Sequence, residues 1–254
     1  MKINSEVSAG EIDVGGSLRL SGGEVRDQIN VGGSVVSDAP LDFGWIDVGG
    51  SVKLSGGKGG KVEVGGTFKS RGDLTFDEID VGGTVNIDGN AAGDTIDVGG
   101  TVKIFGDLKL SGPFKVGGRA EVRGKIEAYN IHVGGRIEAE KIEVVGEIKT
   151  STLRTIHGAK AKRIDISRRG EVEGPVIADY VLARDRARFE DIYAKRVILR
   201  RGSRARNVYA EEVEIEDKCR ISGEVKYTGS LDFESDVRFE HPPEKVESLP
   251  QPPL

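Results

Sequence analysis

The tripeptide Val-Gly-Gly recurs along the first half of this chain at almost constant spacing. Its successive copies begin at Val14, Val31, Val48, Val64, Val81, Val98, Val116 and Val133. Each copy therefore starts sixteen to eighteen positions after the one before it. Apolar and polar residues alternate on both sides of each copy, as in Ile96-Asp-Val-Gly-Gly-Thr-Val-Lys-Ile104. Alternation with a period of two, rich in Val, Ile and Thr, predicts short β-strands between glycine corners.

Each repeat contains three such strand segments. In one repeat they are Ile96–Val98, Val102–Ile104 and Leu108–Leu110, and glycines lie between them. We therefore expect a three-sided coil of about 16–18 residues, with glycines at the corners because they tolerate positive φ. A lone coil leaves both edges of its strands unpaired, so coils must stack about 4.8 Å apart. The predicted fold is all-β, a single-stranded parallel β-solenoid.

The repeat continues in the second half of the chain with a different signature. The segments Ala178–Ala183, Ala194–Leu199 and Ala210–Ile215 follow one another at equal steps, again close to one coil in length. The step between Ile142 and Ile164 is longer than one coil, which fits either a bulged coil or a joint between domains. About fourteen coils fit before the chain ends.

Three regions follow from these signatures. We expect Val-Gly-Gly coils over residues 1–140 and Ala-x-x-Val-x-Ile coils over 141–240. Residues 241–254 hold five of the eight prolines and are predicted to be a flexible tail. This tail is one place where other proteins could bind.

Composition excludes several classes of protein. The formal net charge of −5 and the absence of a basic stripe argue against nucleic-acid binding. No apolar run approaches the length of a membrane span, and Met1–Glu6 is too polar for a signal peptide, so we expect a cytoplasmic protein. The single cysteine, Cys219, rules out an internal disulfide and lies in phase with Ile215 and Ile221. It is predicted to be a buried, inert thiol rather than a redox group.

No catalytic or cofactor-binding arrangement is apparent. His132, His157 and His241 lack partners at metal-ligand spacing, so no metal or cofactor site is predicted. The glycine cluster Ser55–Gly60 is not followed by a helix, and we interpret it as a loose corner rather than a phosphate cradle. A carbohydrate-active β-helix enzyme needs a cleft with acidic groups and aromatic platforms. This chain has short corners and one tryptophan, Trp45, so we do not expect an enzyme.

Outward-facing polar positions form two charged columns in the first half. One column is acidic, and its charged members are Asp13, Asp47, Glu63, Asp80 and Asp97. The other is basic, with Arg19, Lys53, Lys69 and Lys103. Both reverse sign at the coils that carry Lys115 and Glu121. The columns could pair neighbouring solenoids laterally, the acidic column could bind hard cations such as calcium, or both could be solvated faces.

The coil signatures resemble the bactofilins, a family of polymer-forming cytoskeletal proteins. The resemblance rests on the Ala-x-x-Val-x-Ile/Leu coils at Ala178, Ala194 and Ala210 and on the Val-Gly-Gly-x-Val coils before them, and it reaches to about residue 240. It implies a right-handed β-helix whose subunits join end to end into non-polar filaments without nucleotide. Bactofilins usually have a shorter core, and many carry an N-terminal membrane-targeting segment. The segment Met1–Gly10 does not match that targeting segment, which leaves membrane association open.

The ends of a solenoid expose unpaired strand edges that recruit further strands unless they are capped. We therefore expect a self-polymerising structural protein, a cytoskeletal or scaffold filament whose partner is itself. Two alternatives are a monomeric solenoid that binds protein or surface partners and, third, the carbohydrate-active enzyme. The expected polymer contacts are Ile3, Val7, Ile12, Val14, Leu231, Phe233, Val237 and Phe239.

Overall fold

The computed structural model describes residues 1–253, and these form two compact units. The first unit is Met1–Ala128, and the second begins at Tyr129. The described residues contain no helix, and the strand pairs within each unit are parallel. Together they make about 14 turns of β-solenoid. This confirms the predicted all-β solenoid.

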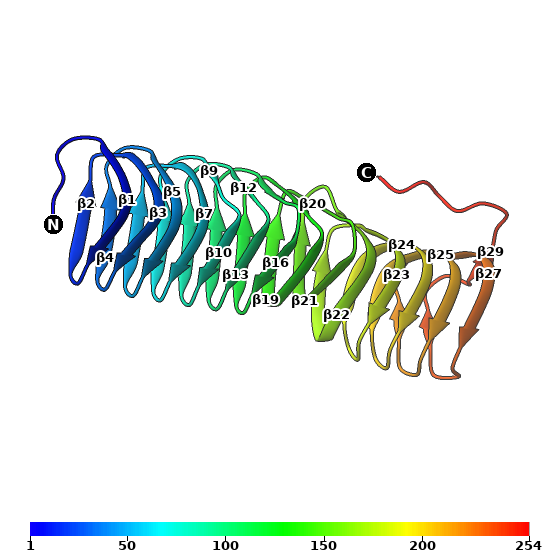
Figure 1. Cartoon of the computed structure of the whole chain (residues 1–254). Coiled ribbons are helices and arrows are strands. Elements are labelled where there is room, and N and C mark those ends of the chain that lie inside the picture. Colours follow the sequence, from blue (N-terminus) through cyan, green and yellow to red (C-terminus); the bar gives the residue numbers. More distant parts are fainter. Residues whose placement is uncertain (254) are drawn as a thin grey trace. The chain divides into compact units, whose positions relative to one another are not determined.

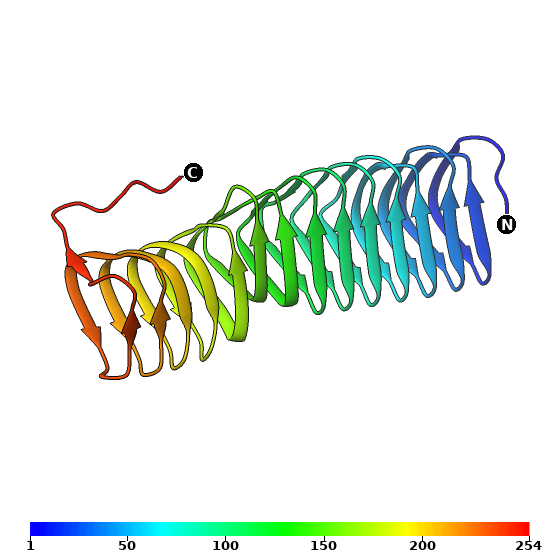
Figure 2. The ribbon, with the colours of Figure 1, turned by 180° about the vertical axis from the view of Figure 1, so that it is seen from behind.

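From β10 onward the strands of the first unit repeat in threes, whereas the earlier strands β1, β3, β5 and β7 each run through two sides of a coil. β13 pairs with β16, β14 with β17 and β15 with β18, so each coil has three sides. Within each unit the coils lie one above another (Figure 1), and the view from behind shows the same stacking (Figure 2). The strands of this unit are β1 (Val7–Val14), β2 (Ser17–Leu20), β3 (Gly23–Val31), β4 (Ser34–Ser37), β5 (Leu41–Val48), β6 (Ser51–Leu54), β7 (Gly57–Val64), β8 (Thr67–Ser70), β9 (Leu74–Thr75), β10 (Glu78–Val81), β11 (Thr84–Ile87), β12 (Ala91–Gly93), β13 (Thr95–Val98), β14 (Thr101–Ile104), β15 (Leu108–Leu110), β16 (Pro113–Val116), β17 (Arg119–Val122) and β18 (Lys125–Ala128).

The sides are named here by their place in the chain. The main corner is the Val-Gly-Gly corner in the first unit and its equivalent in the second. Side 1 is the strand before the main corner, side 2 the strand after it, and side 3 the remaining strand. On each side alternate residues point inward, so that Ile96, Val98 and Val102 are at most 1% exposed. The core is therefore a set of aliphatic rows that run from coil to coil.

Glycine occupies the main corners of the first unit for a reason other than the expected one. None of the Val-Gly-Gly glycines has positive φ. Instead, a Cβ on any of these glycines from Gly32 to Gly118 would lie 2.3–2.8 Å from a carbonyl oxygen of the preceding coil. The backbones also bond directly at these corners, since the N–H of Gly33 donates to the carbonyl of Gly16 at 2.9 Å. Close stacking, and not backbone conformation, excludes side chains here.

The second unit has the same three-sided plan with longer strands. β24 and β25 each run through more than one side of a coil and pair over ten positions, from Arg188↔Arg204 to Leu199↔Ile215. Its strands are β19 (Asn130–Ala139), β20 (Lys141–Val144), β21 (Glu147–Thr155), β22 (Ala159–Glu173), β23 (Val176–Ala183), β24 (Arg188–Leu199), β25 (Arg204–Ile215), β26 (Arg220–Ile221), β27 (Val225–Phe233), β28 (Arg238–Phe239) and β29 (Glu244–Lys245).

The main corner of the second unit is a four-residue turn instead of a glycine pair. Between β24 and β25 it is Arg200–Ser203, and the N–H of Ser203 donates back to the carbonyl of Arg200 at 3.1 Å. The third residue of these turns has positive φ, which is 60° at Arg186, 69° at Gly202 and 61° at Lys218. At the main corners, left-handed residues therefore occur in this unit and mostly without glycine. In the first unit the expected left-handed glycines lie between sides 2 and 3, at Gly22, Gly23, Gly56 and Gly57.

The step between Ile142 and Ile164 is longer than one coil because the two residues lie on different sides of the solenoid. Ile142 pairs with Ala159 on side 3, whereas Ile164 pairs with Ile148 on side 1, so the two isoleucines are not equivalent. The step also contains an irregularity: the register shifts between Thr150 and Thr152, where the single residue 151 of β21 lies opposite the four residues 167–170 of β22.

The Pro-rich segment begins as ordered structure. β29 pairs with β27 at Glu244 and Lys245, and the N–H of Val246 donates to the carbonyl of Tyr227 at 2.9 Å. Beyond β29 the chain leaves the last coil without a further strand (Figure 1). Of the predicted flexible tail 241–254, residues 244–246 instead pair with the last coil, and flexibility stays a prediction only for the residues after Val246.

Candidate functional site

The N-terminal end of the first unit presents an open strand edge. β1 pairs with β3 on one side, and within residues 1–253 no strand covers its other side. On side 2 the N-terminal residues of the chain cover the edge. Lys2 forms an isolated parallel β-bridge with Arg19, and the backbone N–H of Arg19 donates to the carbonyl of Met1 at 3.0 Å. The open edge is thus confined to β1 and the main corner that follows it.

That corner is Gly15–Gly16, and it differs from every later glycine pair of the unit. A Cβ on Gly15 or Gly16 would meet no atom within 4 Å. The same Cβ on Gly32 would lie 2.8 Å from the carbonyl oxygen of Gly15, and on Gly33 2.5 Å from that of Gly16. The first coil therefore carries the glycine pair that a preceding coil would require, but within residues 1–253 a coil lies only on its other side.

The C-terminal end of the second unit also has open edges. The Ser230–Phe233 part of β27 pairs with β25 alone, and β28 and β29 each pair with one strand within the described residues. Phe233 is 50% exposed, and its ring meets that of Phe239 edge-on at 5.2 Å between centroids. An apolar aromatic pair therefore lies at this end.

The eight expected contact residues lie at these two ends, as the sequence predicted. Ile12 is buried, whereas Ile3, Val7, Val14, Leu231, Val237 and Phe239 are half-buried and Phe233 is exposed. Their equivalents in inner coils, such as Ile29 and Val31, are at most 1% exposed. The end residues thus keep apolar surface that an added coil would cover, and their role as contacts stays a prediction.

The two charged columns of the first unit have the expected register. Asp47, Glu63 and Asp80 pair in line on side 1, and Lys53 and Lys69 pair in line on side 2. Some members are neutralised locally: Lys61 lies 2.7 Å from Glu63, Lys115 lies 3.7 Å from Asp97, and Arg19 lies 2.7 Å from Asp38. Asp13, Asp47 and Asp80 form no ion pair with any residue of 1–253.

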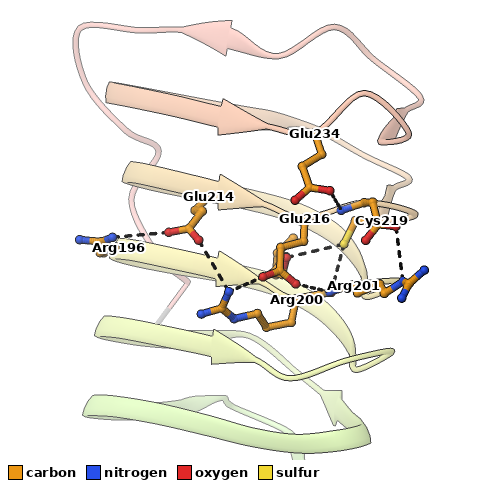
Figure 3. Close-up of polar contacts among 9 residues, drawn as sticks. Arg196, Arg200, Arg201, Glu214, Glu216, Cys219 and Glu234 are labelled. Carbon is orange, nitrogen blue, oxygen red and sulfur yellow. Dashed lines mark hydrogen bonds and ion pairs between the residues drawn. The ribbon is translucent and has the colours of Figure 1, made fainter.

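The main corners of the second unit are held by a network of ion pairs (Figure 3). Arg200 contacts both Glu216 and Glu214, the latter at 3.9 Å. The backbone N–H of Arg201 donates to Glu216 Oε2 at 2.9 Å. Burial alone would raise the pKa of Glu216, but its hydrogen bonds from Arg200 and Arg201 outweigh this and hold it below the usual range. The carboxylate therefore ties one corner to the next.

Cys219 belongs to this network as a structural donor. It is 1% exposed, and its Sγ lies 3.2 Å from the carbonyl oxygen of Arg200 in the preceding corner. Ser203, one coil earlier, makes the same contact, since its hydroxyl donates to the carbonyl of Arg184 at 3.2 Å. Burial raises the pKa of the Cys219 thiol to about 11. The predicted buried thiol is confirmed.

Side 2 of the second unit carries a column of arginines that the sequence analysis missed. Arg188 pairs with Arg204, Arg204 with Arg220, and Arg220 with Arg238, and all four are exposed. Arg220 lies 3.8 Å from Glu240, whereas the other three form no ion pair with residues 1–253. The equal spacing of Arg188, Arg204 and Arg220 along the chain was the signal that could have revealed the column.

Two further polar groups of the second unit, Asp165 and Tyr209, have structural partners. Asp165 is 4% exposed and accepts two hydrogen bonds from Arg184, at 2.7 and 2.8 Å. The ring of Tyr209 stacks on Tyr193 at 5.0 Å, and burial raises the pKa of its hydroxyl to about 12. Residues 1–253 contain no group of three or more His, Cys, Asp or Glu side chains placed to hold a metal ion. No helix within the same residues is long and apolar enough to cross a bilayer.

Comparison of the chain with protein-family models, with curated proteins and with solved structures gives no match. Function is therefore inferred from the geometry of the ends and of the charged columns.

Proposed function

We propose that this protein is a structural, self-polymerising filament protein whose solenoids join end to end without nucleotide. The observation that carries the proposal is the Gly15–Gly16 corner. At the later corners glycine is required because a side chain would collide with the preceding coil. Gly15 and Gly16 are also glycines, yet a Cβ on either would meet no atom within 4 Å. A coil from another copy would occupy that space.

The open edges support the same proposal. An unpaired parallel strand offers its N–H and C=O groups to any further strand. β1 offers this edge at one end, and β27, β28 and β29 offer it at the other. No described helix covers either end. Apolar surface at Val14 and Phe233 would be removed from water when a coil is added.

The test uses the purified full chain without nucleotide, observed by negative-stain electron microscopy and light scattering. We expect the unaltered chain to form filaments about one solenoid wide. Gly15→Ala with Gly16→Ala should abolish them, because each new methyl group would meet the backbone of the added coil. The circular dichroism and melting temperature should not change, since the same methyl groups meet nothing within the chain.

Matched variants separate an end contact from a general effect. Val14→Lys and Phe233→Lys place a charge at either end and should also block assembly. Glu24→Ala, on the exposed flank of β3, should leave it intact. Filaments that persist in all the end variants would overturn the end-to-end contact. An unaltered chain that stays monomeric at every concentration would overturn the filament itself and favour a monomeric binding scaffold.

The same variants determine the polarity of the filament. In a polar filament each end binds the opposite end, so either blocked variant is monomeric alone and a mixture of the two forms one-to-one dimers. In the non-polar filament that the bactofilin resemblance implies, each blocked variant still dimerises through its intact end. Light scattering at equal protein concentration distinguishes these outcomes.

A further inference from the structure

We propose that the arginine column of the second unit, made of Arg188, Arg204, Arg220 and Arg238, binds the acidic column of the first unit on a second copy of this chain. The contact would join filaments side by side. It rests on the proposed function, since it adds a lateral contact to the end-to-end one.

The arginine column is free to take a partner. Its four side chains point outward in strict register, one per coil. Arg188, Arg204 and Arg238 form no ion pair within residues 1–253. Like charges about 4.8 Å apart repel by about 0.9 kcal/mol per neighbouring pair in water. A row of anions with the same period would relieve this repulsion at every step.

The acidic column supplies that period. Asp47, Glu63, Asp80 and Asp97 are aligned by the same parallel pairing, so their carboxylates repeat with the strand spacing of the arginines. Asp47 and Asp80 form no ion pair within residues 1–253, whereas Glu63 and Asp97 already contact Lys61 and Lys115. Next to this column lie the glycine corners, which have no side chains to hold a partner away. Two in-register columns can therefore meet along their length without a mismatch that grows from coil to coil.

The distribution of charge favours a second copy over other polyanions. The formal charge of −5 lies entirely in residues 1–128, whereas residues 129–254 are formally neutral. A nucleic acid or an anionic bilayer would meet the repulsion of the whole first unit. A second copy instead brings its negatively charged first unit to the arginine column. The electrostatic attraction between the two is favourable and becomes stronger at low ionic strength.

The test measures lateral association of assembled filaments at about 0.05 M and 1 M salt, by bundle width in electron microscopy and by low-speed sedimentation. We expect bundles at low salt that dissolve at high salt, where the screening length falls to about 3 Å. R188E with R204E should raise the protein concentration needed for bundling at least about tenfold, while single filaments persist. D47R with D80R should do the same.

Combining all four substitutions in one chain provides the decisive variant. It restores opposite charges across the contact and should restore bundling, which no loss of folding could do. K53E with K69E is the matched control, because it reverses two charges on the basic column of the first unit and should leave bundling unchanged.

Several results would overturn the proposal. Among them are bundles that survive R188E with R204E, failure of the combined variant to recover bundling, and loss of bundling in K53E with K69E. In that last case the partner of the acidic column would be the basic column of the first unit. Binding of R188E with R204E to phosphatidylglycerol vesicles is measured in parallel. If R188E with R204E bundles normally but no longer binds the vesicles, the partner of the arginine column is an anionic bilayer and not a second copy of the chain. Normal filaments that never bundle would remove this lateral contact while leaving the end-to-end function intact.

Discussion

The two units build the same three-sided coil with opposite solutions at the main corner. In Met1–Ala128 the corner is two glycines long, and neighbouring corners touch through their backbones. In the second unit the corner is a four-residue turn, and side chains such as Glu216 and Cys219 connect it to the next one. The first solution depends on the absence of side chains, and the second on their presence.

This difference determines how each unit could be extended. A glycine corner carries no side chain of its own, so any coil with the same backbone can stack on it. A four-residue corner must match the donors and charges of its neighbour. Gly15–Gly16 is thus a general acceptor at one end, whereas the other end offers a specific surface around Phe233 and Phe239.

The largest effect on stability is expected from side chains placed inside the glycine stack. At Gly50 and Gly66 a Cβ would lie 2.3 and 2.5 Å from backbone carbonyl oxygens, so each alanine should cost about 1–3 kcal/mol. Urea unfolding followed by circular dichroism measures the loss for the double variant. Gly15→Ala is the control and should cost nothing. Equal stability of the interior and end variants would show that the corners are not closely stacked.

A smaller loss is expected from breaking the buried pair of the second unit. Arg184→Ala leaves the Asp165 carboxylate buried without its two donors, which should cost about 1–3 kcal/mol at pH 7. Burial alone would raise the pKa of Asp165, but Arg184 outweighs it and holds the pKa below its usual range. The pair therefore stabilises the fold above the ordinary carboxyl pKa, and this contribution is lost as pH falls through the lowered value.

The control for that pair is its exposed counterpart in the first unit. Arg19 also binds a carboxylate with two hydrogen bonds, but both it and Asp38 are about half exposed. Arg19→Ala should therefore change the urea midpoint much less than Arg184→Ala at pH 7. If both variants lose the same stability, burial is not what makes the Asp165 pair important.

The sequence predicted those parts of the fold that repeat and missed those that depend on neighbours in space. Alternation around Val-Gly-Gly determined the strands, the three sides and the inward rows. It could not show that Ile142 and Ile164 lie on different sides, because equal residue types occur on all three sides. It also gave the wrong reason for the Val-Gly-Gly glycines, since their contact with the preceding coil involves backbone atoms that sequence patterns do not describe, whereas Gly22, Gly23, Gly56 and Gly57 do have the expected positive φ.

For the candidate site, the residues at the two ends could be predicted because the order of the coils shows which coils are first and last. The arginine column was not predicted. Arg188 and Arg204 are separated by other arginines in the corners, which hides their spacing. The equal spacing of Arg188, Arg204 and Arg220 hints at a column, and the strand register shows that these three and Arg238 form one line. The charge of a solenoid surface must therefore be summed along columns and not along the chain.

A further test separates conformational strain from steric exclusion. Gly202 has φ of 69°, and a Cβ there would approach only the flexible side chain of Arg186, at 3.3 Å. Gly202→Ala should therefore cost about 1 kcal/mol through its backbone conformation alone. Gly15→Ala, with ordinary φ and free space, is again the control. A cost for Gly202→Ala as large as that of the Gly50 and Gly66 double variant would mean that the four-residue corner is also sterically closed.

The smallest effect is expected at Cys219. Serine at the equivalent position of the preceding corner already makes the same contact, so Cys219→Ser should change the stability by less than about 0.5 kcal/mol, as for a matched substitution. Cys219→Ala removes the donor and should cost about 1 kcal/mol.

The raised pKa of the Cys219 thiol, about 11, adds a dependence of the stability on pH. The unfolded thiol ionises near its ordinary pKa of about 8.5, so stability should fall as pH rises from there toward 11, and the serine variant should lack this decline. A thiol reagent at pH 7.5 should react with the native chain only after denaturant is added, and fast labelling of the folded chain would show that this corner opens.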